Sequence, residues 1–158
     1  MKTQILIILA ITFVSFTGCK KDEPIEFNNE VMITLLNSGM GTSDTVTWVY
    51  PVSEPYFDIS NYSNVKSAVL LVSNIRTSEI DSNNDVTGEG TWELYDLTNN
   101  KTIENSSVTS DDIPEGTYKS SSNFLNNIPG GKIKLGIRIS SGGNYFVSCG
   151  NITLVLSK

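Results

Sequence analysis

Few side chains in this sequence have the chemistry of a catalytic or metal-binding group. The chain contains two cysteines, Cys19 and Cys149, and no histidine. This composition excludes a Ser-His-Asp triad, a histidine-ligated zinc ion and a cysteine nucleophile with a histidine base. Two carboxylates could still hydrolyse a glycoside, but the acidic residues lie mostly in polar segments, and no pair stands in an aromatic setting. We therefore predict that the protein is not an enzyme and holds no cofactor or catalytic metal.

The residues before Cys19 indicate a different chemistry for this thiol. Lys2 gives a basic start, Ile5 to Phe16 form an apolar run, and the small pair Thr17-Gly18 directly precedes the cysteine. This arrangement resembles the cleavage site of bacterial lipoproteins, in which the cysteine becomes the mature N-terminus and its thiol carries diacylglycerol. The apolar run is too short to span a bilayer, which needs roughly 20 apolar residues. We predict a signal peptide over residues 1–18 and stable anchoring by palmitate-type chains on Cys19; the alternative is an ordinary secretory signal with a chance cysteine.

A charged tetrapeptide follows the predicted lipid. Lys20, Lys21, Asp22 and Glu23 resemble the export signal of surface lipoproteins of the Bacteroidota, in which a lysine and acidic residues direct the protein across the outer membrane. The resemblance implies an outer-membrane lipid anchor that faces the cell exterior. The alternative is that the same residues form only a solvated linker, within a tether that covers residues 19–29.

The charge of the chain limits its partners. The formal net charge is −6 and there is no basic run. These features exclude nucleic acid, which requires clustered lysine and arginine, and leave the lipid as the contact with the membrane. Cys149 lies between Val147 and Ile152 in an apolar segment, so we expect a buried and inert thiol without a disulfide.

From residue 30 to residue 158 the pattern predicts one domain of short strands. The clearest strand is Lys132 to Ser140, in which Ile133, Leu135, Ile137 and Ile139 alternate with polar residues or glycine and predict one buried face. Further strands are expected at Val31–Leu36, Thr45–Tyr50, Ser67–Ile75, Gly90–Asp96, Tyr145–Cys149 and Ile152–Leu156, with shorter ones at Lys101–Glu104 and Gly116–Ser120. Strands separated by Gly, Asn and Ser turns predict an all-β, antiparallel, jelly-roll-like β-sandwich.

Three segments carry a family resemblance. The stretch Phe57–Leu70, which contains Asp58-Ile59-Ser60-Asn61-Tyr62, resembles an extended lead-in to a core strand in galactose-binding-like jelly rolls. Trp92–Asp96 and Gly150–Leu156 are compatible with a central and a closing strand of such a domain. The resemblance implies a glycan-binding module, but it assigns no ligand residue.

Glycan binding requires flat aromatic faces and a few polar groups for the sugar hydroxyls. Tyr56 and Tyr62 lie in a turn-rich segment, so we name them as candidate sugar platforms. Trp92 and Tyr95 are secondary candidates; they lie on opposite faces of one strand, so at most one of them is in the core.

Asp81, Asn83 and Asp85 have the alternating oxygen spacing of a calcium loop. Val86 replaces the glycine that such a loop needs, and Trp92 replaces its bidentate glutamate. We predict a solvated turn there. A jelly-roll domain can hold a structural calcium ion elsewhere, but this sequence does not locate such a site.

Three functions remain in order of preference. The first is a lipid-anchored surface module that contacts extracellular glycan. The second is a structural or adhesive lipoprotein that binds another envelope protein through an apolar patch or a free edge strand. The third, an enzyme, would require a cleft with two facing carboxylates.

Overall fold

The computed structural model describes residues 29–37, 39–42, 47–52, 56–79, 89–110, 118–142 and 145–158. The predicted signal peptide, the lipidation site Cys19 and the export signal at residues 20–23 lie outside these ranges, and so does the loop of residues 81–85. In the described ranges, no helix has the length and apolar character needed to cross a membrane.

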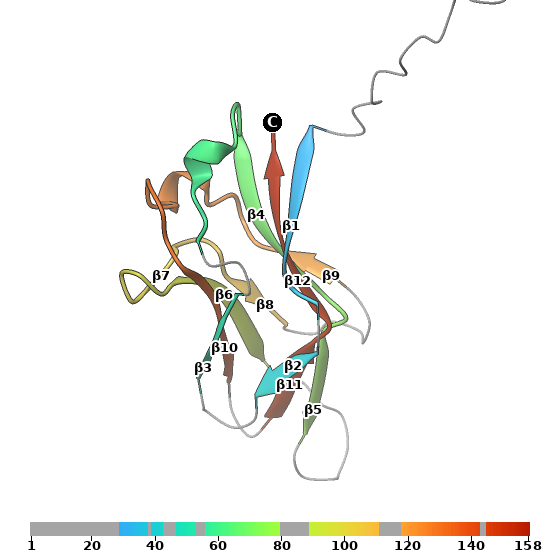
Figure 1. Cartoon of the computed structure of the whole chain (residues 1–158). Coiled ribbons are helices and arrows are strands. Elements are labelled where there is room, and N and C mark those ends of the chain that lie inside the picture. The colour runs from blue at the N-terminus through green and yellow to red at the C-terminus, as the bar shows by residue number, and fades with distance from the viewer. Residues whose placement is uncertain are drawn as a thin grey trace, which may run out of the picture.

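The described residues form an all-β structure of three antiparallel sheets (Figure 1). In the first sheet the order is β1 (Glu30–Leu36), β12 (Asn151–Ser157), β4 (Ser67–Ser73) and β9 (Tyr118–Ser120). In the second it is β3 (Trp48–Pro51), β10 (Leu135–Ser141), β6 (Gly90–Asp96) and β7 (Lys101–Thr102), and β8 (Val108–Thr109) also pairs with β6. The third contains β2 (Met40–Thr42), β11 (Tyr145–Cys149) and β5 (Arg76–Glu79). The predicted antiparallel β-sandwich is therefore confirmed.

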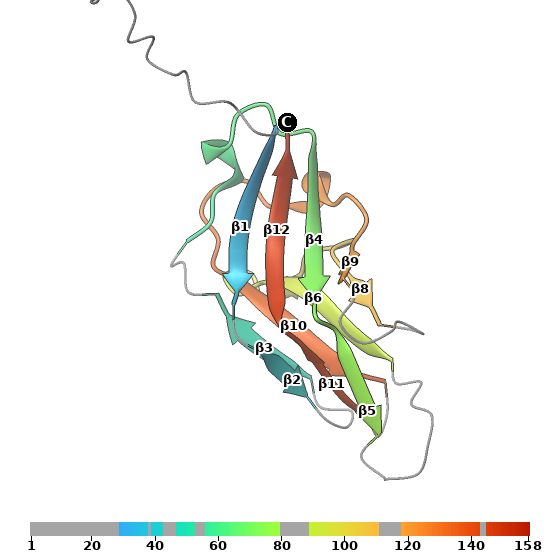
Figure 2. The ribbon, with the colours of Figure 1, turned by 90° about the vertical axis from the view of Figure 1, so that its right-hand side faces the viewer.

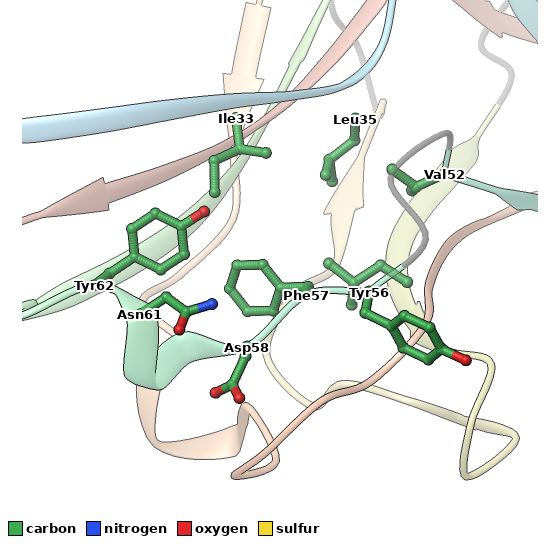
Figure 3. A pocket seen from close by; sticks show the side chains of 9 residues that line it. Ile33, Leu35, Val52, Tyr56, Phe57, Asp58, Asn61 and Tyr62 are labelled. Carbon is green, nitrogen blue, oxygen red and sulfur yellow. The ribbon is translucent and has the colours of Figure 1, made fainter.

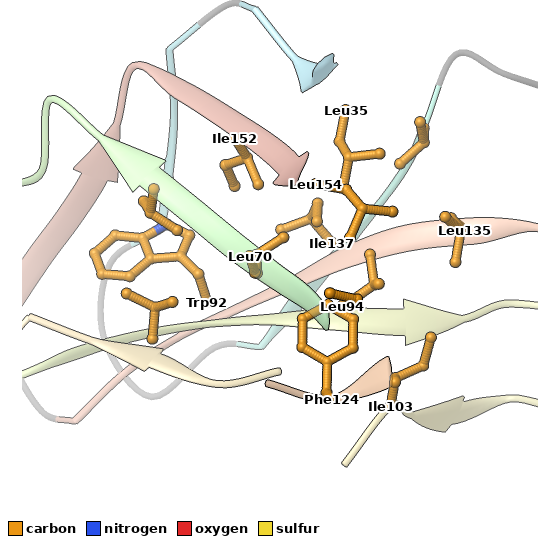
Figure 4. Close-up of a cluster of buried hydrophobic side chains, with 14 of the residues drawn as sticks. Leu35, Leu70, Trp92, Leu94, Ile103, Phe124, Leu135, Ile137, Ile152 and Leu154 are labelled. Atoms are coloured by element: carbon orange, nitrogen blue, oxygen red, sulfur yellow. The ribbon is translucent and has the colours of Figure 1, made fainter. Parts of the chain in front are cut away.

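The core lies between the first two sheets (Figure 4). Alternation along each strand sends every second side chain inward. Leu70 of β4, Leu94 of β6, Ile137 of β10 and Leu154 of β12 all have no exposed surface. The predicted buried face of the segment 132–140 is confirmed, because Ile133, Leu135, Ile137 and Ile139 are each at most 4% exposed.

The third sheet continues the first beyond a common break (Figure 2). β4 leads into β5 through Asn74 and Ile75, and β11 leads into β12 through Gly150. Asn74 adopts a left-handed conformation with φ of 52°, and a Cβ at Gly150 would lie 2.8 Å from its side-chain nitrogen. Glycine is therefore needed where the two breaks meet.

The structure also differs from the predicted elements. The sequence did not predict three of the short strands, β2, β5 and β8, because strands of two to four residues show too little alternation to be recognised. The regular pairing of β10 begins at Leu135 rather than at Lys132, since Ile133 makes a lone bridge with Phe57. This bridge holds Phe57 in place, and Phe57 belongs to the segment that lines the candidate site.

One open side of the sandwich is closed by polar side chains. On that side, the backbone N–H groups of β4 and β6 that lack a strand partner donate instead to side-chain oxygens of residues 106–123. The bonds are Leu70 N to Ser121 Oγ (2.9 Å), Ala68 N to Asn123 Oδ1 (3.0 Å), Leu94 N to Ser106 Oγ (2.9 Å) and Gly90 N to Ser110 Oγ (2.8 Å). The two sheet edges on the opposite side are β1 and β3, and the pocket described next lies there.

Candidate functional site

A pocket of about 240 Å³ opens between the two sheets beside the edge strand β1 (Figure 3). It is lined by Ile33 and Leu35 of β1, Val52 after β3, Leu135 of β10, and Tyr56, Phe57, Asp58, Asn61 and Tyr62 of the following turn. Pockets for drug-sized ligands span roughly 300–1,000 Å³. This smaller pocket is therefore suited to a single compact chemical group.

Backbone pairing holds the start of the turn against β10. The Val52 N–H donates to the Leu135 carbonyl at 3.0 Å. Phe57 and Ile133 exchange two backbone hydrogen bonds, of 2.8 and 2.9 Å. These bonds fix the chain on both sides of the pocket floor and leave Phe57 only 7% exposed.

Asp58 then reverses the chain. Its Oδ1 accepts hydrogen bonds from the Ser60 backbone N–H (3.0 Å) and from the Ser60 hydroxyl (2.6 Å). This cap begins the short 3₁₀ helix η1 (Ile59–Asn61), which ends where the Tyr62 N–H donates to the Ile59 carbonyl at 3.0 Å. The expected extended lead-in therefore contains a helical turn instead, and this turn returns Tyr62 to the pocket.

The Tyr62 ring stacks on Phe57 inside the pocket. The ring centroids are 5.8 Å apart and the planes differ by 20°. Figure 3 shows these two rings facing Ile33 of β1 across the opening, with Leu35 beside it. The interior is thus formed by two rings and aliphatic side chains.

The side chains around this interior also carry polar atoms, at different places: in Figure 3 the Tyr62 hydroxyl lies beside Ile33, whereas the Asp58 carboxylate points away from both rings. The Tyr62 hydroxyl, the Asn61 side-chain amide and Asp58 Oδ2 make no hydrogen bond with any other described residue. The hydrogen bonds from Ser60, its hydroxyl first, lower the pKa of the Asp58 carboxyl below its ordinary value, so it is ionised at neutral pH. The lining therefore offers the Tyr62 hydroxyl and the Asn61 amide to a ligand, with the negative charge of Asp58 nearby.

Tyr56 lies at the outer end of the pocket and is 57% exposed. The Lys134 ammonium lies 5.6 Å from its ring centroid, within the range of a cation–π interaction. In Figure 3 the Tyr56 ring points away from Tyr62. The two predicted tyrosines therefore line one pocket, but they do not form a single flat platform.

The structure contradicts Trp92 as a ligand residue. Its side chain has no exposed surface, because it faces the core from β6, where the absence of a side chain at Gly90 leaves room for it. Tyr95 lies on the opposite, outer face of the same strand, and the predicted opposition of the two rings is confirmed. Its hydroxyl donates to Asn100 at 2.9 Å and its ring lies under Arg138. Tyr95 is not part of the pocket lining.

Cys149 is buried, as expected, and forms no disulfide. Burial raises the pKa of its thiol to about 12, against a smaller lowering by the nearby Trp92 N–H. That indole nitrogen has no partner within hydrogen-bond limits in the described part of the chain. A protonated, enclosed thiol is a packing group and a poor nucleophile.

Two kinds of chemistry receive no support from the described residues. They contain no group of three or more potential metal-ligating side chains. Among the residues that line the pocket, Asp58 is the one carboxylate, whereas glycoside hydrolysis uses two.

The comparisons give this chain no relative: no family model, no curated protein and no solved structure matches it.

The signal for part of the site was present in the sequence. Asp58, two residues before Ser60, is typical of a capped turn, and the aromatic residues around it indicated a platform. Ile33, Leu35, Val52 and Leu135 had no such signal. They lie in strands or beside them and read as ordinary core, and only the arrangement of the two sheets brings them together at one opening.

Proposed function

We propose that this protein is a non-catalytic binding module, anchored in the outer membrane through lipid on Cys19, which contacts extracellular glycan through the pocket beside β1. One observation carries the proposal: Tyr56 and Tyr62 line the same pocket, in which aromatic and aliphatic side chains lie beside polar atoms that have no hydrogen-bond partner among the described residues. A sugar presents C–H faces and hydroxyls together, and it needs this combination of surfaces.

The test is a glycan array probed with the full chain in mild detergent, followed by calorimetric titration of each hit. Tyr56→Ala and Tyr62→Ala should each weaken binding about five-fold, equivalent to about 1 kcal/mol for one stacked ring. Tyr118→Ala is the matched control, because Tyr118 is 75% exposed at the opposite edge of the first sheet. It should bind like the parent chain.

Tyr62→Phe separates structure from recognition. It keeps the stack on Phe57 and removes only the hydroxyl, so it should melt like the parent and still bind more weakly. An empty array, or hits whose affinity is unchanged by every pocket variant, would count against glycan binding at this site.

A second candidate is a protein partner that pairs with β1. Among the described strands, β1 pairs with β12 alone, and Met32 on it is 63% exposed. An edge strand of this kind can accept an added strand. Met32→Lys should abolish such an interaction, whereas glycan binding in the pocket should persist.

A further inference from the structure

Part of the pocket lining is hydrocarbon. Four of the side chains that line it, those of Leu35, Val52, Phe57 and Leu135, are between 2% and 8% exposed. Burying a hydroxyl among such groups without a hydrogen bond costs roughly 1–3 kcal/mol, as judged from protein variants. A sugar that placed a bare hydroxyl against these four side chains would therefore lose affinity, whereas one that placed a methyl group there would gain it.

We infer that the pocket receives a methyl-bearing substituent of the sugar, with the acetamido group of an N-acetylated hexosamine as the best match, while the ring hydroxyls stay at the mouth. This inference rests on the proposed glycan-binding function and names its ligand class. An acetamido group has a methyl, an N–H donor and a carbonyl acceptor.

The lining also matches the polar part of that group. The Asn61 side-chain carbonyl or the Tyr62 hydroxyl oxygen can accept from the amide N–H. The Asn61 amide and the Tyr62 hydroxyl can each donate to the carbonyl oxygen. The substituent thus finds hydrocarbon for its methyl and partners for both polar atoms.

The charges near the mouth are compatible with a neutral group. The Asp58 carboxylate is negative and interacts electrostatically with Lys132, while Lys134 lies over Tyr56 on the outer side. Charges of both signs therefore surround the opening. A carboxylate substituent would be repelled by Asp58 but attracted by the lysines, and a free amine the reverse, so a neutral acetamido group fits here without depending on either charge.

The experiment compares sugars that differ only in this substituent. The full chain in detergent is titrated with N-acetylglucosamine and glucose, and with N-acetylgalactosamine and galactose. Within at least one pair, the acetylated sugar should bind about four-fold tighter or better, the equivalent of one buried methyl group. In saturation-transfer NMR, the acetyl methyl protons should receive the strongest signal.

Two variants of β1 localise the effect. Ile33→Thr keeps a β-branched residue on the strand but places a hydroxyl in the pocket wall, so it should reduce the preference to less than two-fold. Thr34→Val, at the exposed neighbouring position, should leave the preference intact.

Failure of the inference and failure of the proposed function give different results. Equal affinity within both pairs, with binding still weakened by Tyr62→Ala, overturns the acetamido inference and keeps a glycan site. Absence of binding to all four sugars together with an empty array overturns both.

Discussion

Replacement of Ser106 by alanine should destabilise the domain, although the residue lies in a short polar segment. The Ser106 hydroxyl is fully buried; it accepts from Leu94 N at 2.9 Å and donates to the Ile103 carbonyl at 2.6 Å. It fills the gap between β7 and β8, where the edge of β6 opposite β10 has no strand partner. The side chain thus replaces one step of a sheet ladder.

The magnitude follows from the group left behind. In Ser106→Ala the Leu94 N–H would be buried without an acceptor, which costs roughly 1–3 kcal/mol. The Ile103 carbonyl would keep one weaker bond from the residue 106 backbone N–H, at 3.3 Å. We therefore expect a loss of about 2 kcal/mol, which corresponds to a decrease in Tm of roughly 5–10 °C for a domain of this size.

Urea unfolding of the two adjacent variants measures the effect. Ser107→Ala is the control, because Ser107 is exposed and makes no hydrogen bond that the described residues show; its cost should stay within about 0.5 kcal/mol. Hydrogen exchange at the Leu94 amide should accelerate in Ser106→Ala alone. Equal stability of the two variants, or unchanged exchange at Leu94, would refute the argument.

Three further predictions address the core, the thiol and the anchor. Ile137→Asp places an unpaired charge at a fully buried position and should lower the free energy of unfolding by more than about 4 kcal/mol. Arg138→Ala, on the outer face, should lower it by about 1 kcal/mol or less. Similar losses for the two variants in urea unfolding would show that the buried face of β10 is misassigned. Because the pKa of Cys149 is raised to about 12 from its ordinary value of 9.0, the free energy of unfolding should fall as pH rises between these values. Cys149→Ala should lack this part of the decline, and an identical pH profile in both proteins would contradict it. Cys19→Ala should release the protein from the membrane fraction; a Cys19→Ala protein that still sediments after a high-salt wash would disprove the anchor. Alanines at residues 21–23 should keep the protein anchored but protect it from protease added to whole cells. Unchanged protease cleavage of that variant would disprove the export signal.

The sequence was sufficient to predict the strands that have one buried face. In β10 the period-2 alternation of apolar and polar residues predicts both the strand and its buried face, whereas in β6 it predicts the strand without saying which face is buried. It also placed Trp92 and Tyr95 on opposite faces, as observed. The error was to keep Trp92 as a ligand candidate, since alternation alone does not say which of the two faces is covered.

Long-range features could not be predicted in this way. Asn105-Ser106-Ser107 reads as a polar turn, yet Ser106 is buried because the edge of β6, twelve residues earlier, needs an acceptor. The pocket depends in the same way on β1 and β10, whose pocket residues Ile33 and Leu135 are about a hundred positions apart in the chain. Contacts across that separation leave no trace in local periodicity.

The most direct test of the central claim is the map of backbone amide shifts when the best glycan hit is added to the ¹⁵N-labelled chain. Binding in the pocket should shift the amides of Ile33 and Leu35 on β1 together with those of Asp58, Asn61 and Tyr62, and it should leave Tyr118 at the far edge unchanged. Shifts that centre on Tyr118 or Tyr95 instead, with the pocket amides unmoved, would contradict the account.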